Sequence, residues 1–357
     1  MNKDRLSLLF VFAALFGSLL AGGPDAAHAQ GEVRERSATP SSTPPPPVII
    51  PEEEEIIRID TELVNLNVRV VDRNNRPINN LNTTDFNIFE DNVPQRIEFF
   101  SRSEVPTNYS LVIDNSGSLR PQIYEVIEAS KIIVSTNRPG DETSVIRFVS
   151  SEKIEIMQDF TDSQVDLDDA LENLYIEGGR TAIIDAVYLA VQKISQYEAA
   201  NPNDRKRRAL ILVSDGEDVK SYFSQKQLFD LLRETDVQIY AVGFIKDLDD
   251  RGGFISKSDQ SKAKSFLEDL AMETGGKAYF PNAVSELDGI AREIASEMRM
   301  QYSIGYIPTN DKEDGTYRNI KVMVNDGPGK QKRIAVTRAG RVANGADGAP
   351  MLQKVNN

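Results

Sequence analysis

The sequence predicts an α/β fold in which a doubly wound, Rossmann-like and mostly parallel sheet is inserted between two β segments. Short runs rich in β-branched residues alternate with helical patterns along the middle of the chain, as in a parallel sheet whose strands are buried on both faces. Alternating apolar positions, typical of half-buried strands, come before and after this region. The chain of 357 residues exceeds the size at which a single core usually stops growing, so we expect two or three structural units.

Export and spacer signals occupy the start of the chain. Residues 1–29 are predicted to be a signal peptide, because basic residues precede an apolar stretch at residues 6–21, and Ala27 and Ala29 form a small-x-small cleavage site. Retention of this stretch as a membrane anchor is the alternative, since its length approaches that of a span. Residues 30–55, with consecutive prolines and an acidic run, are predicted to be a disordered linker. We therefore expect an exported protein, periplasmic, cell-surface or secreted, with no membrane span once the leader is cleaved.

The two flanking regions have the patterns of short strands separated by turns. Residues 56–103 form the predicted N-terminal β segment, which includes a hairpin over residues 86–100. Residues 301–338 form the predicted C-terminal β segment, with a hairpin and a third strand. Neither segment is long enough to build a core of its own, so we hypothesise that the two pair as one small β-sandwich. Residues 339–357, rich in Gly and Ala, are predicted to be a disordered tail.

Residues 104–300 form the predicted central domain. Its strands are expected at residues 109–113, 144–148, 209–213 and 238–242. Its helices are expected at residues 123–135, 165–174, 182–195, 225–233, 262–272 and 284–300. Because strand and helix alternate, the strands are expected to run mostly parallel, with helices covering the sheet.

Composition excludes several classes of partner and of chemistry. The net charge of −14 and the pI near 4.8 disfavour nucleic acid as a partner, and the basic run at residues 205–208 is interpreted as a solvated lead-in to a strand. Cysteine is absent, and the single histidine, His28, lies in the predicted leader. The mature chain therefore lacks the side chains for disulfides, a conventional zinc site or Ser-His-Asp catalysis. No enzymatic activity is expected.

Polar residues that suit a metal ion follow two of the predicted strands. Asp114, Ser116 and Ser118 leave the first strand of the central domain on a tight loop, and Asp215 lies two residues after the third. Ligands of open α/β sheets bind at this carboxyl edge, where such loops meet. Thr181, after two glycines in a loop between these strands, adds a further hydroxyl. We expect the three loops to converge on one site.

These side chains offer only oxygen ligands, two of them carboxylates. Such a set suits a hard cation, and a small cage completed by water favours Mg²⁺, with Mn²⁺ or Ca²⁺ as substitutes. The Asp-x-Ser-x-Ser motif alone has another interpretation, because Asp and Ser at a strand-to-helix junction are common helix caps. The presence of all three elements in this order favours the metal site.

The three elements resemble the metal-ion-dependent adhesion site (MIDAS) of von Willebrand factor type A domains, and the resemblance covers about residues 106–300. The flanking segments resemble a bacterial subgroup of such proteins that is common in Acidobacteria. The implied metal ligands are Ser116 and Ser118 directly, and Thr181, Asp114 and Asp215 directly or through water. The resemblance also implies a protein partner whose Glu or Asp carboxylate completes the metal shell, and hence a role in metal-dependent adhesion or protein–protein binding.

Two other functions are compatible with the sequence. One is Mg²⁺-dependent phosphotransfer with Asp114 as the nucleophile, although Ser116 stands where haloacid-dehalogenase-like phosphatases need a second Asp. The other is an envelope scaffold whose metal site is vestigial. Metal binding that depends on Ser116 and Ser118 would distinguish a metal-dependent binding protein from a scaffold whose metal site is vestigial.

Overall fold

The computed structural model describes residues 63–102, 104–197, 206–245 and 257–343. The predicted signal peptide, the predicted linker and residues 344–357 lie outside this part of the chain. Among the helices of the described residues, none combines the length and the apolar character needed to cross a membrane.

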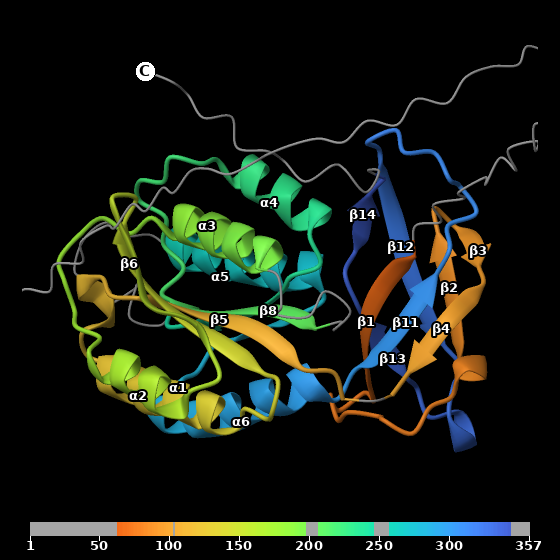
Figure 1. Cartoon of the computed structure of the whole chain (residues 1–357), viewed down its shortest axis with the longest axis horizontal. Helices are drawn as coiled ribbons and strands as arrows, with labels where there is room; N and C mark the ends of the chain where they lie inside the picture. The colour runs from red at the N-terminus through yellow and green to blue at the C-terminus, as the bar shows by residue number, and fades with distance from the viewer. Residues whose placement is uncertain (1–62, 103, 198–205, 246–256, 344–357) are drawn as a thin grey trace, which may run out of the picture. The chain divides into compact units, whose positions relative to one another are not determined.

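A six-stranded sheet forms the centre of the α/β part of the chain, where Figure 1 labels β5, β6 and β8; its order is β10-β9-β8-β5-β6-β7. Its strands are β5 (Thr107–Asp114), β6 (Glu142–Ser150), β7 (Lys153–Thr161), β8 (Arg207–Ser214), β9 (Gln238–Gly243) and β10 (Lys277–Tyr279). Neighbouring strands are parallel except at one edge, where β7 runs antiparallel to β6. Every residue of β5 and β9 is buried, as expected for strands covered on both faces.

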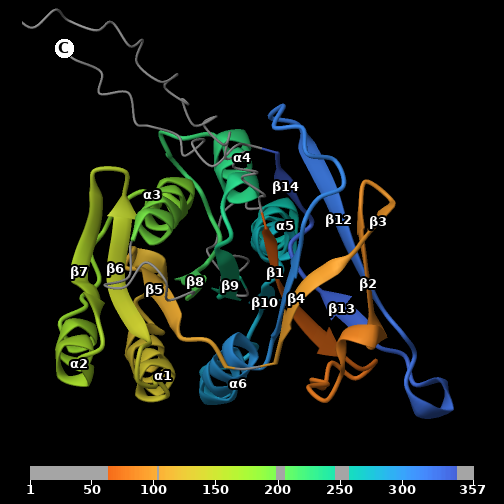
Figure 2. The ribbon, with the colours of Figure 1, turned by 45° about the vertical axis from the view of Figure 1, so that its right-hand side comes forward.

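Helices of the described residues cover both faces of this sheet, as Figure 2 shows. On one face lie α1 (Ile123–Ser135), α2 (Gln164–Glu172) and α6 (Leu287–Arg299), and on the other α3 (Ile183–Gln196), α4 (Gln225–Glu234) and α5 (Lys257–Thr274). The alternation of side chains along each strand separates the two cores. In β5, Leu111 and Ile113 join the first core and Val112 joins the second. The doubly wound sheet predicted from the sequence is thus confirmed.

Two four-stranded antiparallel sheets are built from the flanking segments. The first has the order β13-β1-β11-β4 and the second the order β14-β12-β2-β3. Their strands are β1 (Val64–Val71), β2 (Phe86–Glu90), β3 (Val93–Gln95), β4 (Ile97–Ser101), β11 (Tyr302–Tyr306), β12 (Tyr317–Val324), β13 (Ile334–Val336) and β14 (Gly340–Val342). Because β1 pairs with β11 and β2 with β12, both segments contribute to each sheet. One apolar core joins the sheets, including Leu66, Ile88 and Ile304, which agrees with the hypothesis that the segments pair.

One predicted hairpin is partly wrong and the other is wrong. The turn at Asp91 and Asn92 has positive φ at both residues, as expected, but only β3 pairs with β2; after Gln95 the chain crosses to the other sheet as β4. Likewise β11 and β12 do not form a hairpin, because each lies in a different sheet. A sandwich needs such crossings, and local alternation of apolar residues does not reveal them.

The predicted disordered tail is also wrong at its start, since β14 pairs with β12. The side chain of Arg341 donates to the buried carboxylate of Glu90 at 3.0 Å, and the Tyr306 hydroxyl donates to the same oxygen at 2.6 Å. Gly340 permits the close approach of the two strands, since a Cβ there would lie 2.3 Å from the carbonyl oxygen of Arg318. These contacts explain why a Gly- and Ala-rich segment is ordered here.

Buried arginines hold the C-terminal end of α6, the last helix of the central domain. Arg69 of β1 pairs with Glu297 at 2.6 Å, and both side chains are almost fully buried. Arg207, at the start of β8, donates to the carbonyl oxygens of Met298, Arg299 and Gln301. It therefore satisfies backbone groups that a helix end leaves without partners. Arg207 was predicted to be part of a solvated basic run; instead it is buried, and burial lowers its pKa to about 10.

We expect the substitution Arg69→Met to lower the free energy of unfolding by about 3 kcal/mol, because it leaves Glu297 buried with only the more distant Lys277 as a partner. The double substitution Arg69→Met with Glu297→Leu should recover much of this loss, since no buried charge then remains unpaired. Urea unfolding measures both changes. The control Arg96→Met removes an arginine that is 87% exposed in its pair with Glu98. A loss no larger than that of the control contradicts the role assigned to the buried pair.

Candidate metal centre

Asp114 is the last residue of β5, at the carboxyl edge in the middle of the sheet. Its side chain has no solvent exposure, and both of its oxygens accept hydrogen bonds. Oδ1 accepts from the backbone N–H of Ser116 and Oδ2 from the hydroxyl of Ser214, each at 2.8 Å. The carboxylate is therefore fixed by the loop that follows β5 and by the end of β8.

Ser116 and Ser118 lie in the short turn after Asp114, where residues 117–119 form a 3₁₀ helix. Their hydroxyl oxygens are 2.7 Å apart, so these two alternate residues of the loop point to the same place. Ser116 occupies the N-cap of the 3₁₀ helix, yet its side chain makes no capping hydrogen bond. The helix-cap interpretation of the motif therefore does not account for these hydroxyls.

Asp215 follows β8, the strand beside β5, and is also buried. Its Oδ1 accepts from the N–H of Glu217 at 3.1 Å, which shapes the loop after the strand. Burial, and next the negative charge of Asp215, raise the pKa of Asp114 to about 7. The two carboxylates are thus near enough for their charges to oppose each other.

Thr181 lies in the loop before α3 and is buried. Its carbonyl oxygen accepts from the N–H groups of Val219 and Lys220, at 2.8 and 3.3 Å, which joins its loop to the Asp215 loop. Asn115 joins the loop that contains Thr181 to the Asp114 loop. The carbonyl oxygen of Asn115 accepts from the N–H of Glu177, and its side chain donates to the carbonyl oxygen of Tyr175. Hydrogen bonds thus link the three loops that carry the predicted site residues.

Two residues that support the site, Ser214 and Asp185, were not predicted from the sequence. Ser214 bonds to Asp114, and its place beside Asp215 at the end of a strand is a signal that could have been used. Asp185, in the first turn of α3, accepts from the N–H groups of Tyr222 and Phe223, both at 2.8 Å, and so anchors the far end of the Asp215 loop. Its helical pattern gives no hint of this contact, since the partners lie far along the chain.

The side chains at this edge fit a hard cation. The donors are carboxylate and hydroxyl oxygens, and two buried carboxylates can balance the charge of one divalent ion. Among the described residues no group of three or more His, Cys, Asp or Glu side chains could hold a metal, so a site here depends on the hydroxyls and on water.

Comparison with known proteins gives one family match. The family model for the von Willebrand factor type A domain matches residues 110–293. The human collagen alpha-6(VI) chain is 29% identical over 144 residues, which are 39% of this chain and 6% of the collagen chain. An uncharacterized protein of Synechocystis is 32% identical over 114 residues, 32% of this chain and 26% of that protein. This chain thus spans about a quarter or less of either relative.

Among the solved structures to which this chain is similar is one that contains a metal ion. It is proximal thread matrix protein 1 from the mussel byssus with a zinc-occupied MIDAS motif, which is 20% identical to this chain. The match covers 58% of this chain and 48% of that one, with a TM-score of 0.42.

We expect Asp185→Ala to lower the free energy of unfolding by about 2 kcal/mol, because two backbone N–H groups lose their acceptor. Chemical denaturation monitored by circular dichroism measures the change. Asp169→Ala, which removes an exposed carboxylate of α2, is the matched control. If the two variants are equally stable, Asp185 does not anchor the loop.

Proposed function

This chain belongs to the von Willebrand factor type A domain family, and from that premise we propose that it is an exported protein that binds a protein ligand through a divalent cation. The cation would be held by oxygen atoms from three loops: Asp114, Ser116, Ser118, Thr181 and Asp215. Export rests on the predicted signal peptide, which lies outside the described residues. Assignment to a subgroup common in Acidobacteria likewise stays a prediction.

The observation that carries this proposal is the pair of buried carboxylates beside two hydroxyls that lie 2.7 Å apart. Two carboxylates that oppose each other in a buried place are unfavourable without a counter-charge. A lysine or arginine would serve that purpose in a purely structural pair, whereas Asp114 accepts from the backbone N–H of Ser116 and from the hydroxyl of Ser214. A divalent cation supplies the counter-charge and uses the hydroxyls as ligands. Mg²⁺ is favoured because few protein ligands converge here and water would complete the shell.

The chain's own residues prepare the site for a protein ligand. Ser214 and the N–H of Ser116 orient Asp114, and the loop hydrogen bonds of Asn115 and Thr181 keep the three loops together. When bound, the cation would offer a coordination position to a Glu or Asp carboxylate of the partner.

Exposed apolar and aromatic side chains on the same loops favour a protein partner over a small molecule. Tyr175 is 53% exposed, Val219 56% and Tyr222 85%. Tyr175 belongs to the segment bonded to Asn115, and Val219 to the segment bonded to Thr181. Aromatic side chains of this kind supply much of the binding energy in protein interfaces. We therefore favour coordination of a protein partner over phosphotransfer, since the contacts of Asp114 described above do not indicate phosphotransfer.

Calorimetric titration with Mg²⁺ tests the site. We expect the mature protein to bind one Mg²⁺ ion, and the double variant Ser116→Ala, Ser118→Ala to bind it at least about 100-fold more weakly, since even outer-shell partners contribute about 10–100-fold. The control is Ser135→Ala with Ser195→Ala, two serines that bond to helical carbonyls away from the site. Equal affinity in the test variant and the control would refute the proposed ligands.

A further inference from the structure

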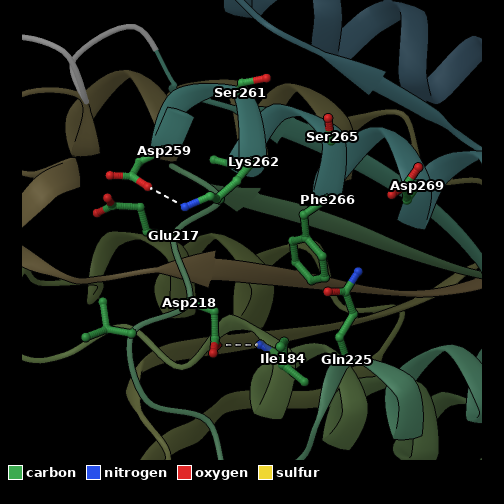
Figure 3. A pocket seen from close by; sticks show the side chains of 13 residues that line it. Ile184, Glu217, Asp218, Gln225, Asp259, Ser261, Lys262, Ser265, Phe266 and Asp269 are labelled. Atoms are coloured by element: carbon green, nitrogen blue, oxygen red, sulfur yellow. Dashed lines mark hydrogen bonds and ion pairs between the residues drawn. The ribbon is translucent and has the colours of Figure 1, made fainter. Parts of the chain in front are cut away.

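The central sheet has a cavity at each end of its parallel strands. The larger one, of about 590 Å³, lies at the carboxyl edge between the loop of residues 216–219 and helix α5, where Figure 3 shows the ring of Phe266 pointing toward Gln225. Because this loop begins directly after Asp215, the larger cavity belongs to the candidate metal centre. The smaller one, of about 310 Å³, lies at the amino edge, beside residues that precede or begin β5, β8 and β9. The length of β8, roughly 23 Å, separates the two edges, so the smaller cavity is independent of the metal centre.

One wall of this smaller cavity, the junction cavity, is a face of the first antiparallel sheet. Asn65 and Asn67 alternate with the core residues of β1, so they point away from the core between the two antiparallel sheets. Across the sheet, Asn67 lies opposite Ser303 of β11, while Asn65 and Phe99 of β4 both lie opposite Gly305. This wall therefore presents two amides, a hydroxyl and an aromatic ring to the cavity.

The opposite wall carries three consecutive cations, Lys206, Arg207 and Arg208, at the start of β8. Lys206 pairs with Glu142 at 2.5 Å, and Arg208 pairs with Asp236 at 3.1 Å. Two of the three positive charges are thus balanced by one carboxylate each.

The charge of Arg207 is not balanced in this way. Its guanidinium donates to carbonyl oxygens at the end of α6 and to the hydroxyl of Ser303, and it pairs with no carboxylate of the described residues. The carbonyls at a helix end carry only partial negative charge. Burial lowers the pKa of Arg207 to about 10, so the group stays charged at neutral pH. Three cations and two carboxylates leave one positive charge in excess at this wall.

Hydrogen-bond donors are also available in the junction cavity. An ammonium group has three N–H groups and a guanidinium has five. Lys206 and Arg208 each donate to one carboxylate oxygen, which leaves further N–H groups on both. The amide of Asn67 makes no side-chain hydrogen bond with any described residue. The cavity therefore offers several donors around an excess positive charge.

These features suit a small organic carboxylate. A carboxylate only accepts hydrogen bonds, forms its strongest ones with charged donors, and carries the single negative charge that the wall lacks. Phe99, which is 39% exposed, and Val105 supply apolar surface for the body of such a ligand. The volume of about 310 Å³ is at the lower end of the range for ligand pockets, which limits the ligand to a small one.

We propose that the junction cavity binds a small organic carboxylate, whose oxygens accept from Arg208 and Asn67 while its apolar body packs on Phe99. Arg207, behind the wall, contributes its charge without a direct contact. Because the ligand touches both the first antiparallel sheet and the start of β8, its binding stabilises their junction.

A titration followed by ¹⁹F NMR tests the proposal with the full mature chain. The probe is 4-fluorobenzoate, and 4-fluorobenzamide is its neutral counterpart of the same shape. We expect a dissociation constant on the order of 1 mM for the benzoate, and binding at least about tenfold weaker for the benzamide, which lacks the charged acceptor. Chelator is present throughout, so the result does not depend on the proposed metal centre.

Two variants locate the binding site. We expect Arg208→Gln to weaken the binding of 4-fluorobenzoate about tenfold, because it removes a charged donor. Asn67→Leu keeps every charge and removes one neutral donor, so we expect a loss of about fivefold. The control Arg96→Gln removes an exposed arginine that also pairs with one carboxylate, and it should bind as the wild type does. Arg208 is partly exposed in its pair, so its substitution is expected to leave the fold intact, which circular dichroism checks.

Weaker binding in both cavity variants, with wild-type affinity in the control, supports the proposal. Equal affinity for the benzoate and the benzamide overturns it, because the charge is then not recognised. Wild-type affinity in both cavity variants also overturns it, since the carboxylate then binds elsewhere, and so does the absence of any binding to the wild type. Displacement of the probe by an equal concentration of inorganic phosphate overturns the assignment to a carboxylate.

Discussion

Two buried carboxylates at the carboxyl edge of the sheet, Asp114 and Asp215, are the constraint on which the surrounding loops depend. Burial and mutual repulsion raise the pKa of Asp114 to about 7, so the pair is unfavourable without a counter-charge. The loops nevertheless hold both groups in place through Ser116, Ser214 and the N–H of Glu217. A protein that needed only stability would gain more from apolar residues here. The divalent cation that we propose would supply this counter-charge.

The two β sheets and the central domain are connected at the end of α6. Arg69 reaches Glu297 from the first sheet, and Arg207 binds the last carbonyls of the helix just before β11 begins. The flanking segments therefore also contribute to the central domain, because Arg69 of β1 supplies the positive charge that pairs with Glu297 of α6. Insertion of the α/β domain between the two segments places both of its ends beside these contacts.

Local patterns predicted the central sheet well. The buried runs around Leu111 and Leu212 and the helix over residues 123–135 are where the sequence places them, because burial on both faces and helical periodicity are visible in a single segment. The Asp114 loop and its convergence with neighbouring loops follow from the rule that ligands meet at the carboxyl edge. The sequence could not show β7, a half-exposed edge strand, or β10, which is too short to have a pattern.

Features that depend on distant partners were not predictable. Arg207 looks like part of a solvated basic run until the carbonyls of α6 are placed beside it. The position of β14 depends on the contact of Arg341 with Glu90, which lies far earlier in the chain. Asp185 of α3 accepts a hydrogen bond from the N–H of Phe223, which lies in another segment. The cavity beside Asp215 combines residues from one loop and three helices, so it cannot be recognised from any single run of the sequence.

The most direct test of the central claim is anomalous diffraction from a crystal of the mature protein grown with Mn²⁺. The account predicts one strong anomalous peak at the carboxyl edge of the sheet, bounded by the hydroxyl oxygens of Ser116 and Ser118 and by Asp215, and lost in the variant that lacks both serines. A crystal in which Mn²⁺ is absent from this edge, with Asp114 and Asp215 bonded only to protein groups, would contradict it.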